Sequence, residues 1–233
     1  TISSIFEVTT KPMIYDGDTG GRSEHFVFTV RTLERLGVSA VVIEDKVGLK
    51  KNSLLGNEVK QTQDNIEDFC AKIQAGKNAQ VSDDFMIIAR TEALIAEKGM
   101  DEAIRRANAY ENAGADAILI HSKKNTPDEI FEFSNKWEGK IPLVVVPTSY
   151  PSVKVNELIS HKIKMVIYAN QSLRAAHNIM LKVLQETLEK GSLDQVNVEQ
   201  SSMNDIFKLQ EMYKINDQEK MIQKNLKKMG YMN

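Results

Sequence analysis

The sequence predicts an α/β protein built as a TIM-type (β/α)8 barrel, on the basis of three observations. Short apolar segments rich in Val and Ile alternate along the chain with segments of helical length. These apolar segments show little alternation of polar and apolar residues, which is typical of strands buried on both faces of a parallel sheet. Polar residues follow the ends of successive strands, and a closed barrel gathers such ends around one mouth, whereas an open sheet spreads them along a line.

Strands and helices are predicted in strict alternation over the first 170 residues. The strands are expected at 12–16, 39–44, 85–90, 116–121, 142–147 and 164–170. The helices between them are expected at 24–36, 62–75, 101–112, 127–137 and 153–160. The third helix is the clearest, because Ala103, Ala107 and Tyr110 form one apolar stripe and Gly114 supplies a C-terminal stop. Pro127 is a residue type that favours the start of a helix.

A closed barrel of this class has eight strands, and this sequence supplies six of them. Residues 1–8 look like the end of a helix that leads into the first strand, so the first two βα units are expected to be lacking. After Asn170 the sequence becomes helical, at 171–190, 203–214 and 218–228. We therefore expect a partial barrel over residues 1–190 and a helical C-terminal extension over residues 191–233 that packs on a partner subunit.

Composition narrows the class of protein. The net charge of −2 argues against a nucleic-acid-binding surface. The single cysteine, Cys70, rules out an internal disulfide framework and fits a reducing cytosol. No apolar run approaches the roughly 18–20 residues of a membrane span, and the first ten residues do not resemble a signal peptide. These observations predict a cytoplasmic protein that binds neither nucleic acid nor a membrane.

Acidic residues follow the first two predicted strands. Asp16 and Asp18 come after the first strand and Glu44 ends the second, although turn formation alone would also explain the first two. Neighbouring strand ends lie about 5 Å apart, so three carboxylates there would repel one another without a cation. Mg2+ takes oxygen ligands and keeps several waters. We therefore expect a Mg2+ site in which one carboxylate binds directly and the others act through water.

Basic residues end the next two strands. Arg90 ends the third strand and His121 the fourth. Arginine matches a carboxylate or phosphate group with two parallel hydrogen bonds, so Arg90 is a candidate anion ligand. Glu92 is an alternative, purely structural partner for it, and a lone histidine is usually structural, but the expected mouth position favours binding roles. Residues 50–52 add two lysines and an amide, although spacing alone favours a solvated loop there.

At these residues the sequence resembles the phosphoenolpyruvate mutase/isocitrate lyase superfamily, and within it the phosphoenolpyruvate mutase family, from residue 12 to about residue 198. The most specific part is Glu44-Asp45-Lys46, followed after three residues by Lys50 and then by Asn52-Ser53. The run Asp16-Gly17-Asp18-Thr19-Gly20 resembles the metal motif of the superfamily. Further similar segments are 88–93, 114–117, 121–122 and 146–148.

The resemblance implies an eight-stranded barrel that interconverts phosphoenolpyruvate and phosphonopyruvate, the first step of phosphonate biosynthesis. It implies Mg2+ held chiefly by Asp16, with Asp18 and Glu44 in its water-mediated shell. Arg90 and His121 would hold the substrate and the migrating phosphoryl group. The remaining implied site residues lie on a gating loop: Lys50, Asn52 and Ser53. The resemblance also implies a homotetramer, a dimer of dimers whose C-terminal helices are exchanged between subunits.

Other functions remain open at this stage. Phosphonopyruvate hydrolase shares the scaffold, but its loop typically departs from this one at the position of Asn52, which favours the mutase. Carbon–carbon lyases of the superfamily carry a cysteine in a Lys-Lys-Cys-Gly-His loop, whereas Cys70 lies elsewhere in this chain. A catalytically silent, truncated barrel is the alternative from a different class.

Overall fold

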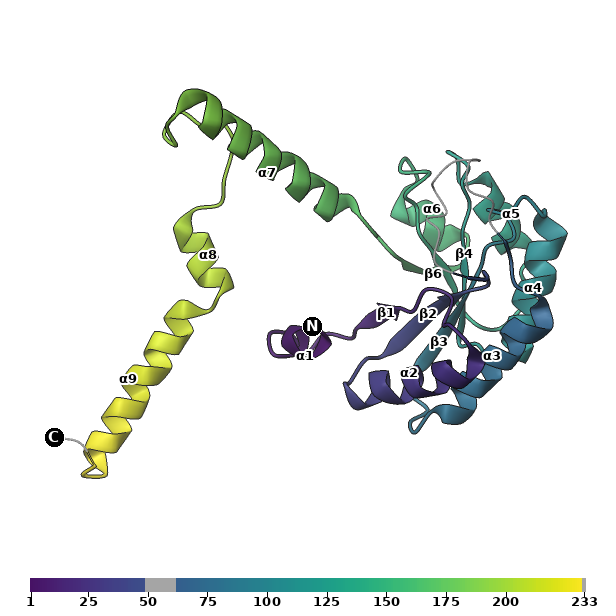
Figure 1. Cartoon of the computed structure of the whole chain (residues 1–233), viewed down its shortest axis with the longest axis horizontal. Coiled ribbons are helices and arrows are strands. Elements are labelled where there is room, and N and C mark those ends of the chain that lie inside the picture. The colour runs from purple at the N-terminus through teal and green to yellow at the C-terminus, as the bar shows by residue number, and fades with distance from the viewer. Residues whose placement is uncertain (49–61, 232–233) are drawn as a thin grey trace. The chain divides into compact units, whose positions relative to one another are not determined.

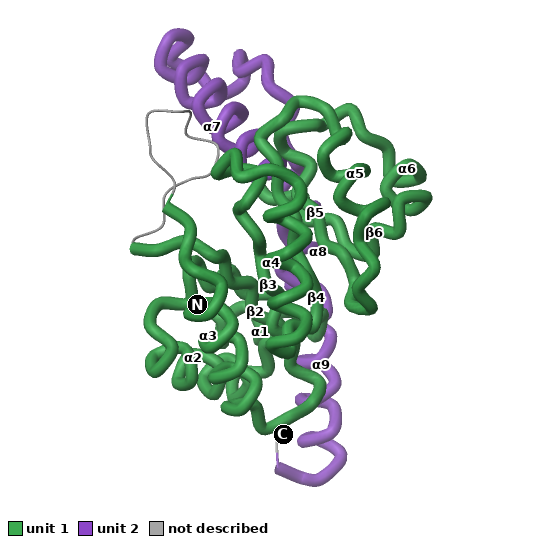
Figure 2. Tube along the Cα trace, turned by 90° about the vertical axis from the view of Figure 1, so that its right-hand side faces the viewer, with its two compact units in different colours: residues 1–169 green, residues 170–233 purple. Residues whose placement is uncertain are grey.

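The computed structural model describes residues 1–48 and 62–231, which form two compact units, Thr1–Ala169 and Asn170–Asn233 (Figures 1 and 2). The first unit holds a curled parallel sheet whose six strands follow one another in chain order. The strands are β1 (Ile14–Asp16), β2 (Ala40–Glu44), β3 (Met86–Thr91), β4 (Ala117–Ile120), β5 (Leu143–Val145) and β6 (Ile163–Val166). The predicted α/β class and its parallel strands are confirmed. Among the described residues β1 and β6 are the sheet edges, so closure to eight strands stays a prediction.

Helices connect the strands and cover the outer face of the sheet (Figure 1). The helices of the first unit are α1 (Ile2–Phe6), α2 (Ser23–Arg35), α3 (Ile66–Ala79), α4 (Met100–Asn112), α5 (Asp128–Lys136) and α6 (Val155–Ser160). The helix predicted at 62–75 instead begins at Ile66, because the side chain of Asn65 accepts a hydrogen bond from the Asp68 amide and caps the helix there. The strand predicted at 164–170 is shorter and ends at Val166.

Side chains alternate between the two faces of the sheet. Val41 and Ile43 point into the core between sheet and helices, whereas Ala40 and Val42 point to the inner, concave face. β3 divides in the same way, with Ile87 on the helix side and Ile88 on the inner side. Both faces are therefore buried, which explains why these strands read as continuous apolar runs.

The second unit consists of helices alone: α7 (Gln171–Lys190), α8 (Met203–Leu209) and α9 (Met212–Lys228). α7, which the sequence analysis placed with the barrel, belongs to this unit. The helix predicted at 203–214 stops at Leu209, and Glu211, with a left-handed φ of 54°, separates it from α9. No described side chain of these helices is buried within this chain.

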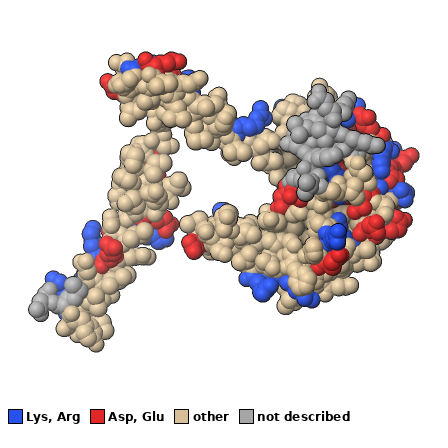
Figure 3. Space-filling view, in the orientation of Figure 1, with Lys and Arg blue, Asp and Glu red and all other residues tan. Residues whose placement is uncertain are grey.

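Surface charge is mixed rather than concentrated. On the face of the first unit in Figure 3, basic and acidic side chains lie interspersed in small groups. In the described part of the chain, no helix is both long enough and apolar enough to span a membrane. The cytoplasmic location stays a prediction.

Close approach of α3 to its neighbours depends on Gly76. A Cβ added at this position would lie 2.5 Å from Cε1 of Phe26 in α2 and 2.6 Å from Cδ1 of Ile87 in β3. Both contacts are far shorter than real Cβ contacts, and the Phe26 ring is fully buried. The packing of α3 on the sheet therefore requires a residue without a side chain here.

We predict that Gly76→Ala destabilises the protein despite the better helix propensity of alanine. The propensity gain is about 1 kcal/mol, whereas overpacking a tight core costs about 1–3 kcal/mol. Urea unfolding should give a lower free energy of unfolding than for the parent. The exposed position Gln74 in the same helix provides the control, since Gln74→Ala should change stability by less than about 0.5 kcal/mol. Increased stability of Gly76→Ala would show that α3 can move away from Phe26.

Candidate active site

The predicted site residues that the structure describes lie at or just beyond the carboxyl ends of β1 to β4. The sheet register pairs Asp16 with Val42 and Glu44 with Arg90. These residues therefore face the inner, concave side of the sheet, as Ala40 and Val42 do. Leu119 of β4 pairs with Arg90 and so faces the same side. His121 comes two residues after Leu119 and therefore also faces the concave side. The structure therefore directs side chains from four successive strands to one end of the concave face.

A buried network of charges joins two of these strand ends, those of β2 and β3. The carboxylate of Glu92 accepts a hydrogen bond from Nε of Arg90 at 2.6 Å and lies 3.0 Å from Nζ of Lys46. The carboxylate of Glu44 lies 3.4 Å from Nζ of Lys46 and 3.5 Å from Nε of Arg90. The Glu92 side chain is only 1% exposed and that of Arg90 15%. Two cations and two anions thus neutralise one another out of water.

Electrostatics keep Glu92 ionised in this network. Burial by itself raises the pKa of this carboxyl, but the hydrogen bond from Arg90 and the positive charges of Arg90 and Lys46 hold the pKa well below its ordinary value. Glu92 is therefore a permanent anion that holds Arg90 at the mouth.

His121 is a neutral imidazole with a defined tautomer. Its Nδ1 lies 2.7 Å from Nη2 of Arg90 and 3.4 Å from Oε1 of Glu92. A guanidinium can only donate, so the contact with Arg90 requires Nδ1 to accept a hydrogen bond. The contact with Glu92 would require Nδ1 to donate. We assign Nδ1 as the acceptor because the contact with Arg90 is the shorter one. Burial and the neighbouring Arg90 charge lower the pKa of His121. The proton then sits on Nε2, which is buried without a hydrogen-bond partner among the described residues.

The turn that carries Asp16 and Asp18 is fastened to β2. The amide of Gly17 donates to the carbonyl of Val42 at 2.8 Å, and the amide of Glu44 donates to the carbonyl of Asp18 at 2.7 Å. Asp18 has a left-handed φ of 54°, and its amide donates to Oδ1 of Asp16 at 3.1 Å. These bonds bring the acidic turn and Glu44 to neighbouring strand ends.

The donor set suits Mg2+ with few direct protein ligands. Asp16 and Asp18 are exposed carboxylates, while Glu44 is 3% exposed and engaged by Lys46 and Arg90. In residues 1–48 and 62–231, no three His, Cys, Asp or Glu side chains are grouped closely enough to hold a metal directly. Mg2+ commonly keeps several waters and takes one or two carboxylates, so these residues fit it with water completing the shell.

Sequence reasoning identified part of this site and missed part of it. Asp16, Glu44, Arg90 and His121 come together at one end of the sheet, as expected. The sequence predicts no role for Lys46, and it indicates Glu92 only as a structural partner of Arg90. Their signal was the density of charge directly after apolar strands, which requires pairing on burial. The predicted loop residues lie outside the described residues: Lys50, Asn52 and Ser53.

The fold is that of an enzyme of the phosphoenolpyruvate mutase/isocitrate lyase superfamily. Residues 1–188 match the family model described as phosphoenolpyruvate phosphomutase, and the chain belongs to that family. It is 42% identical over 209 residues to phosphonopyruvate hydrolase of Variovorax sp. (strain Pal2), covering 89% of this chain and 72% of that protein. It is 40% identical over 203 residues to phosphoenolpyruvate phosphomutase of Tetrahymena pyriformis, covering 87% and 67%.

Solved structures give the same relationship. The crystal structure of phosphoenolpyruvate phosphomutase from Streptomyces platensis subsp. rosaceus superposes with a TM-score of 0.89 at 38% identity, over 94% of this chain and 76% of that one. Phosphonopyruvate hydrolase in complex with oxalate and Mg2+ superposes with a TM-score of 0.84 at 39% identity, over 93% and 74%. Mutases and a hydrolase are thus similar to this chain to nearly the same degree.

We predict that Glu92→Gln destabilises the protein near neutral pH by about 3–5 kcal/mol, because Arg90 and Lys46 lose their shared buried anion. The depressed pKa means that the contribution of Glu92 is present above its ordinary value of 4.5 and is lost as the pH falls below it. Urea unfolding of parent and variant should therefore give a difference that narrows in acid.

Glu132→Gln is the matched control for this prediction. Glu132 is 51% exposed and pairs with Lys136 on the surface of α5, so its loss should change stability by less than about 1 kcal/mol. A Glu92→Gln difference that stays constant with pH would contradict the ion-pair assignment.

Proposed function

We propose that this protein is an isomerase that interconverts phosphoenolpyruvate and phosphonopyruvate, the first step of phosphonate biosynthesis. One observation carries the proposal: Arg90 and His121 contact each other at 2.7 Å, and the imidazole has a buried Nε2–H with no described partner. A fixed guanidinium beside a neutral N–H donor suits a phosphoryl or carboxylate group. The relatives named phosphoenolpyruvate phosphomutase support the reaction.

In this proposal, each site residue has a distinct task. Arg90 binds an anionic group of the substrate and is held in place by Glu92. Nε2 of His121 donates a hydrogen bond to an oxygen of the migrating phosphoryl group. By resemblance, Lys50, Asn52 and Ser53 contact the same group and exclude water, which would otherwise capture the phosphoryl group.

Asp16 would hold Mg2+, with Asp18 and Glu44 in its water-mediated shell. A structurally similar hydrolase was solved with oxalate and Mg2+. When bound, Mg2+ supplies Lewis-acid stabilisation of negative charge on the pyruvate oxygens. In the reaction a phosphorus–oxygen bond breaks and a phosphorus–carbon bond forms, with no net change in protons. The transition state is expected to be loose, so positioning of the phosphoryl group is the main contribution of the protein.

Phosphonopyruvate hydrolase is the second candidate. The Variovorax relative with that name is 42% identical, marginally above the Tetrahymena mutase at 40%. The same described residues would serve hydrolysis, with water as the acceptor. Asn52 favours the mutase by the resemblance of the loop motif.

We further propose that the protein forms a homotetramer, a dimer of dimers with exchanged C-terminal helices. The second unit leaves many large apolar side chains exposed in this chain. In α7 they include Leu173, Ile179, Met180, Leu181, Leu184 and Leu188. Exposed apolar surface on this scale is typical of an interface, which supports the proposal.

The decisive experiment is phosphorus NMR of phosphonopyruvate incubated with the protein and Mg2+. We expect a phosphoenolpyruvate signal to grow until the two isomers reach equilibrium. Inorganic phosphate as the product would instead identify a hydrolase. Absence of turnover in Mg2+, with the protein folded by circular dichroism, would contradict both activities and support a catalytically silent domain. Added EDTA should stop turnover.

We predict that Asp16→Ala lowers turnover about 100-fold or more while leaving the fold intact, because removing one group that stabilises the reacting charge costs that much. Asp16 is exposed, so water can take the place of its carboxylate in the variant. Turnover as a function of Mg2+ concentration and the thermal midpoint are the two measurements. Asp83→Ala, at an exposed position preceding β3, is the control and should match the parent. Parental turnover of Asp16→Ala at limiting Mg2+ would overturn the metal assignment.

A further inference from the structure

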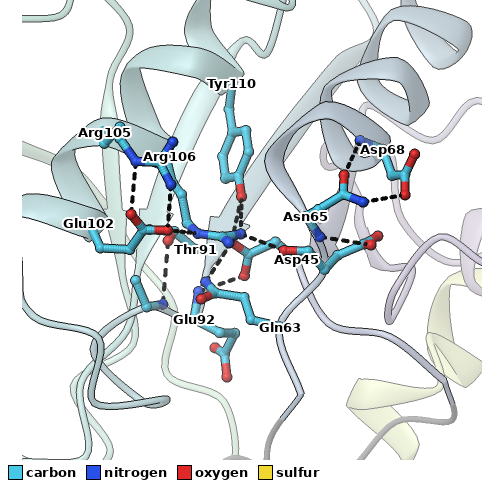
Figure 4. A network of polar contacts seen from close by, with 12 residues as sticks. Asp45, Gln63, Asn65, Asp68, Thr91, Glu92, Glu102, Arg105, Arg106 and Tyr110 are labelled. Atoms are coloured by element: carbon cyan, nitrogen blue, oxygen red, sulfur yellow. Dashed lines mark hydrogen bonds and ion pairs between the residues drawn. The ribbon is translucent and has the colours of Figure 1, made fainter.

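A second buried polar network lies behind the charged residues of the mouth, centred on the carboxylate of Asp45 (Figure 4). Its Oδ2 accepts hydrogen bonds from the Tyr110 hydroxyl at 2.5 Å, from Nε2 of Gln63 at 2.8 Å and from Nη1 of Arg106 at 3.0 Å. Its Oδ1 accepts from the backbone amide of Glu92 at 2.8 Å. The Asp45 and Arg106 side chains are 0% and 4% exposed.

The backbone of Asp45 extends the same connections. Its amide donates to the carbonyl of Arg90 at 3.1 Å, and its carbonyl accepts from the amide of Asp64 at 2.9 Å. Nη1 of Arg106 also donates to the carbonyl of Asp64 at 2.9 Å. Through its backbone, Asp45 therefore joins the end of β2 to the end of β3 and to the residues that precede α3.

The network reaches the mouth through the backbone of Glu92. Oδ1 of Asp45 fixes the peptide that carries Glu92, and the Glu92 carboxylate holds Nε of Arg90 at 2.6 Å. Arg90 in turn orients the imidazole of His121. A shift of Asp45 would therefore move the guanidinium and the imidazole together.

Stability alone is a poor reason for this arrangement. A buried ion pair commonly contributes less than an apolar pair of similar volume would, because both charges must leave water. Here Arg106 and Tyr110 extend from α4, in the outer layer, to the carboxylate of Asp45. Both oxygens of that carboxylate accept hydrogen bonds. Full satisfaction of a buried polar network holds its members in one geometry.

We propose that Arg106 and Tyr110 of α4 are positioning residues that act through Asp45 and Glu92 to set the place of Arg90 and His121. The expected change in kcat rests on the proposed function. The expected change in the local structure around Glu92 rests on the hydrogen bonds alone. Both residues are buried against Asp45, and neither is assigned a contact with substrate.

The test uses the variants Arg106→Gln, Arg106→Lys and Tyr110→Phe. Arg106→Gln should lower kcat about 100-fold, because a displacement near 1 Å at the reacting groups costs about that much. Arg106→Lys keeps the charge beside Asp45 and should recover part of kcat. Tyr110→Phe removes one hydroxyl and should lower kcat about tenfold with KM changed less than about threefold. Tyr110→Phe is also the variant that decides the question where Arg106→Gln fails to fold.

Phe133→Leu is the matched stability control. Phe133 is fully buried in α5 and makes none of the hydrogen bonds to Asp45. Its variant should lose stability through a cavity and keep the parental kcat at temperatures where the protein is folded. Equal kcat loss in Phe133→Leu and the network variants, at matched stability, would overturn the positioning role.

Amide exchange provides a readout that does not depend on turnover. In Arg106→Gln the Glu92 amide should exchange about tenfold faster than in Phe133→Leu. The lost hydrogen bonds allow the segment around Asp45 to unfold locally in Arg106→Gln, whereas in Phe133→Leu this amide exchanges only when the whole domain unfolds. If the parent protein does not convert phosphonopyruvate, the proposed function fails by itself, and amide exchange decides the positioning role. Equal exchange of the Glu92 amide in both variants would overturn it.

Discussion

Arg90 and Lys46 both lie against the buried carboxylate of Glu92, at 2.6 and 3.0 Å, and the arrangement of the mouth depends on these contacts. With this carboxylate, Arg90 faces His121 with a fixed guanidinium, and the imidazole is left with a single protonated nitrogen for a ligand. Without it, Lys46 and Arg90 would lie in a nearly dry site with one described carboxylate fewer, and both would face Glu44. The cost of burying these charges is met by pairing and by hydrogen bonds, and the resulting geometry needs little reorganisation when an anion binds.

The parallel sheet supplies the constraint that brings these charges together. Its register pairs Glu44 with Arg90, and a strand period of two directs both to the concave face. The acidic turn after β1 is fastened to the same end by bonds from Gly17 and to Asp18. A metal held at Asp16 would thus lie beside the anion-binding residues, which is the combination that phosphoryl transfer requires.

Support for the mouth comes from deep in the outer layer. Burial raises the pKa of Asp45 to about 6, although four hydrogen bonds and the charge of Arg106 favour its ionised form. This carboxylate therefore depends on α4 to remain charged. The dependence joins core packing to the chemistry of the site, since the same carboxylate fixes the backbone of Glu92.

The sequence by itself determined the βα order, the parallel sheet and the place of Asp16, Glu44, Arg90 and His121 at strand ends, because these follow from local periodicity. The burial of Arg106 could also be predicted from the sequence, because it lies on the apolar stripe of Ala103, Ala107 and Tyr110. A buried arginine requires a buried partner. Which partner it found was decided only by the tertiary structure: Asp45 lies 61 residues away in the chain. The pairing of Glu92 with both Lys46 and Arg90, and the tautomer of His121, were decided in the same way. Contacts between distant segments depend on how helices and strands pack, and local periodicity does not predict that packing.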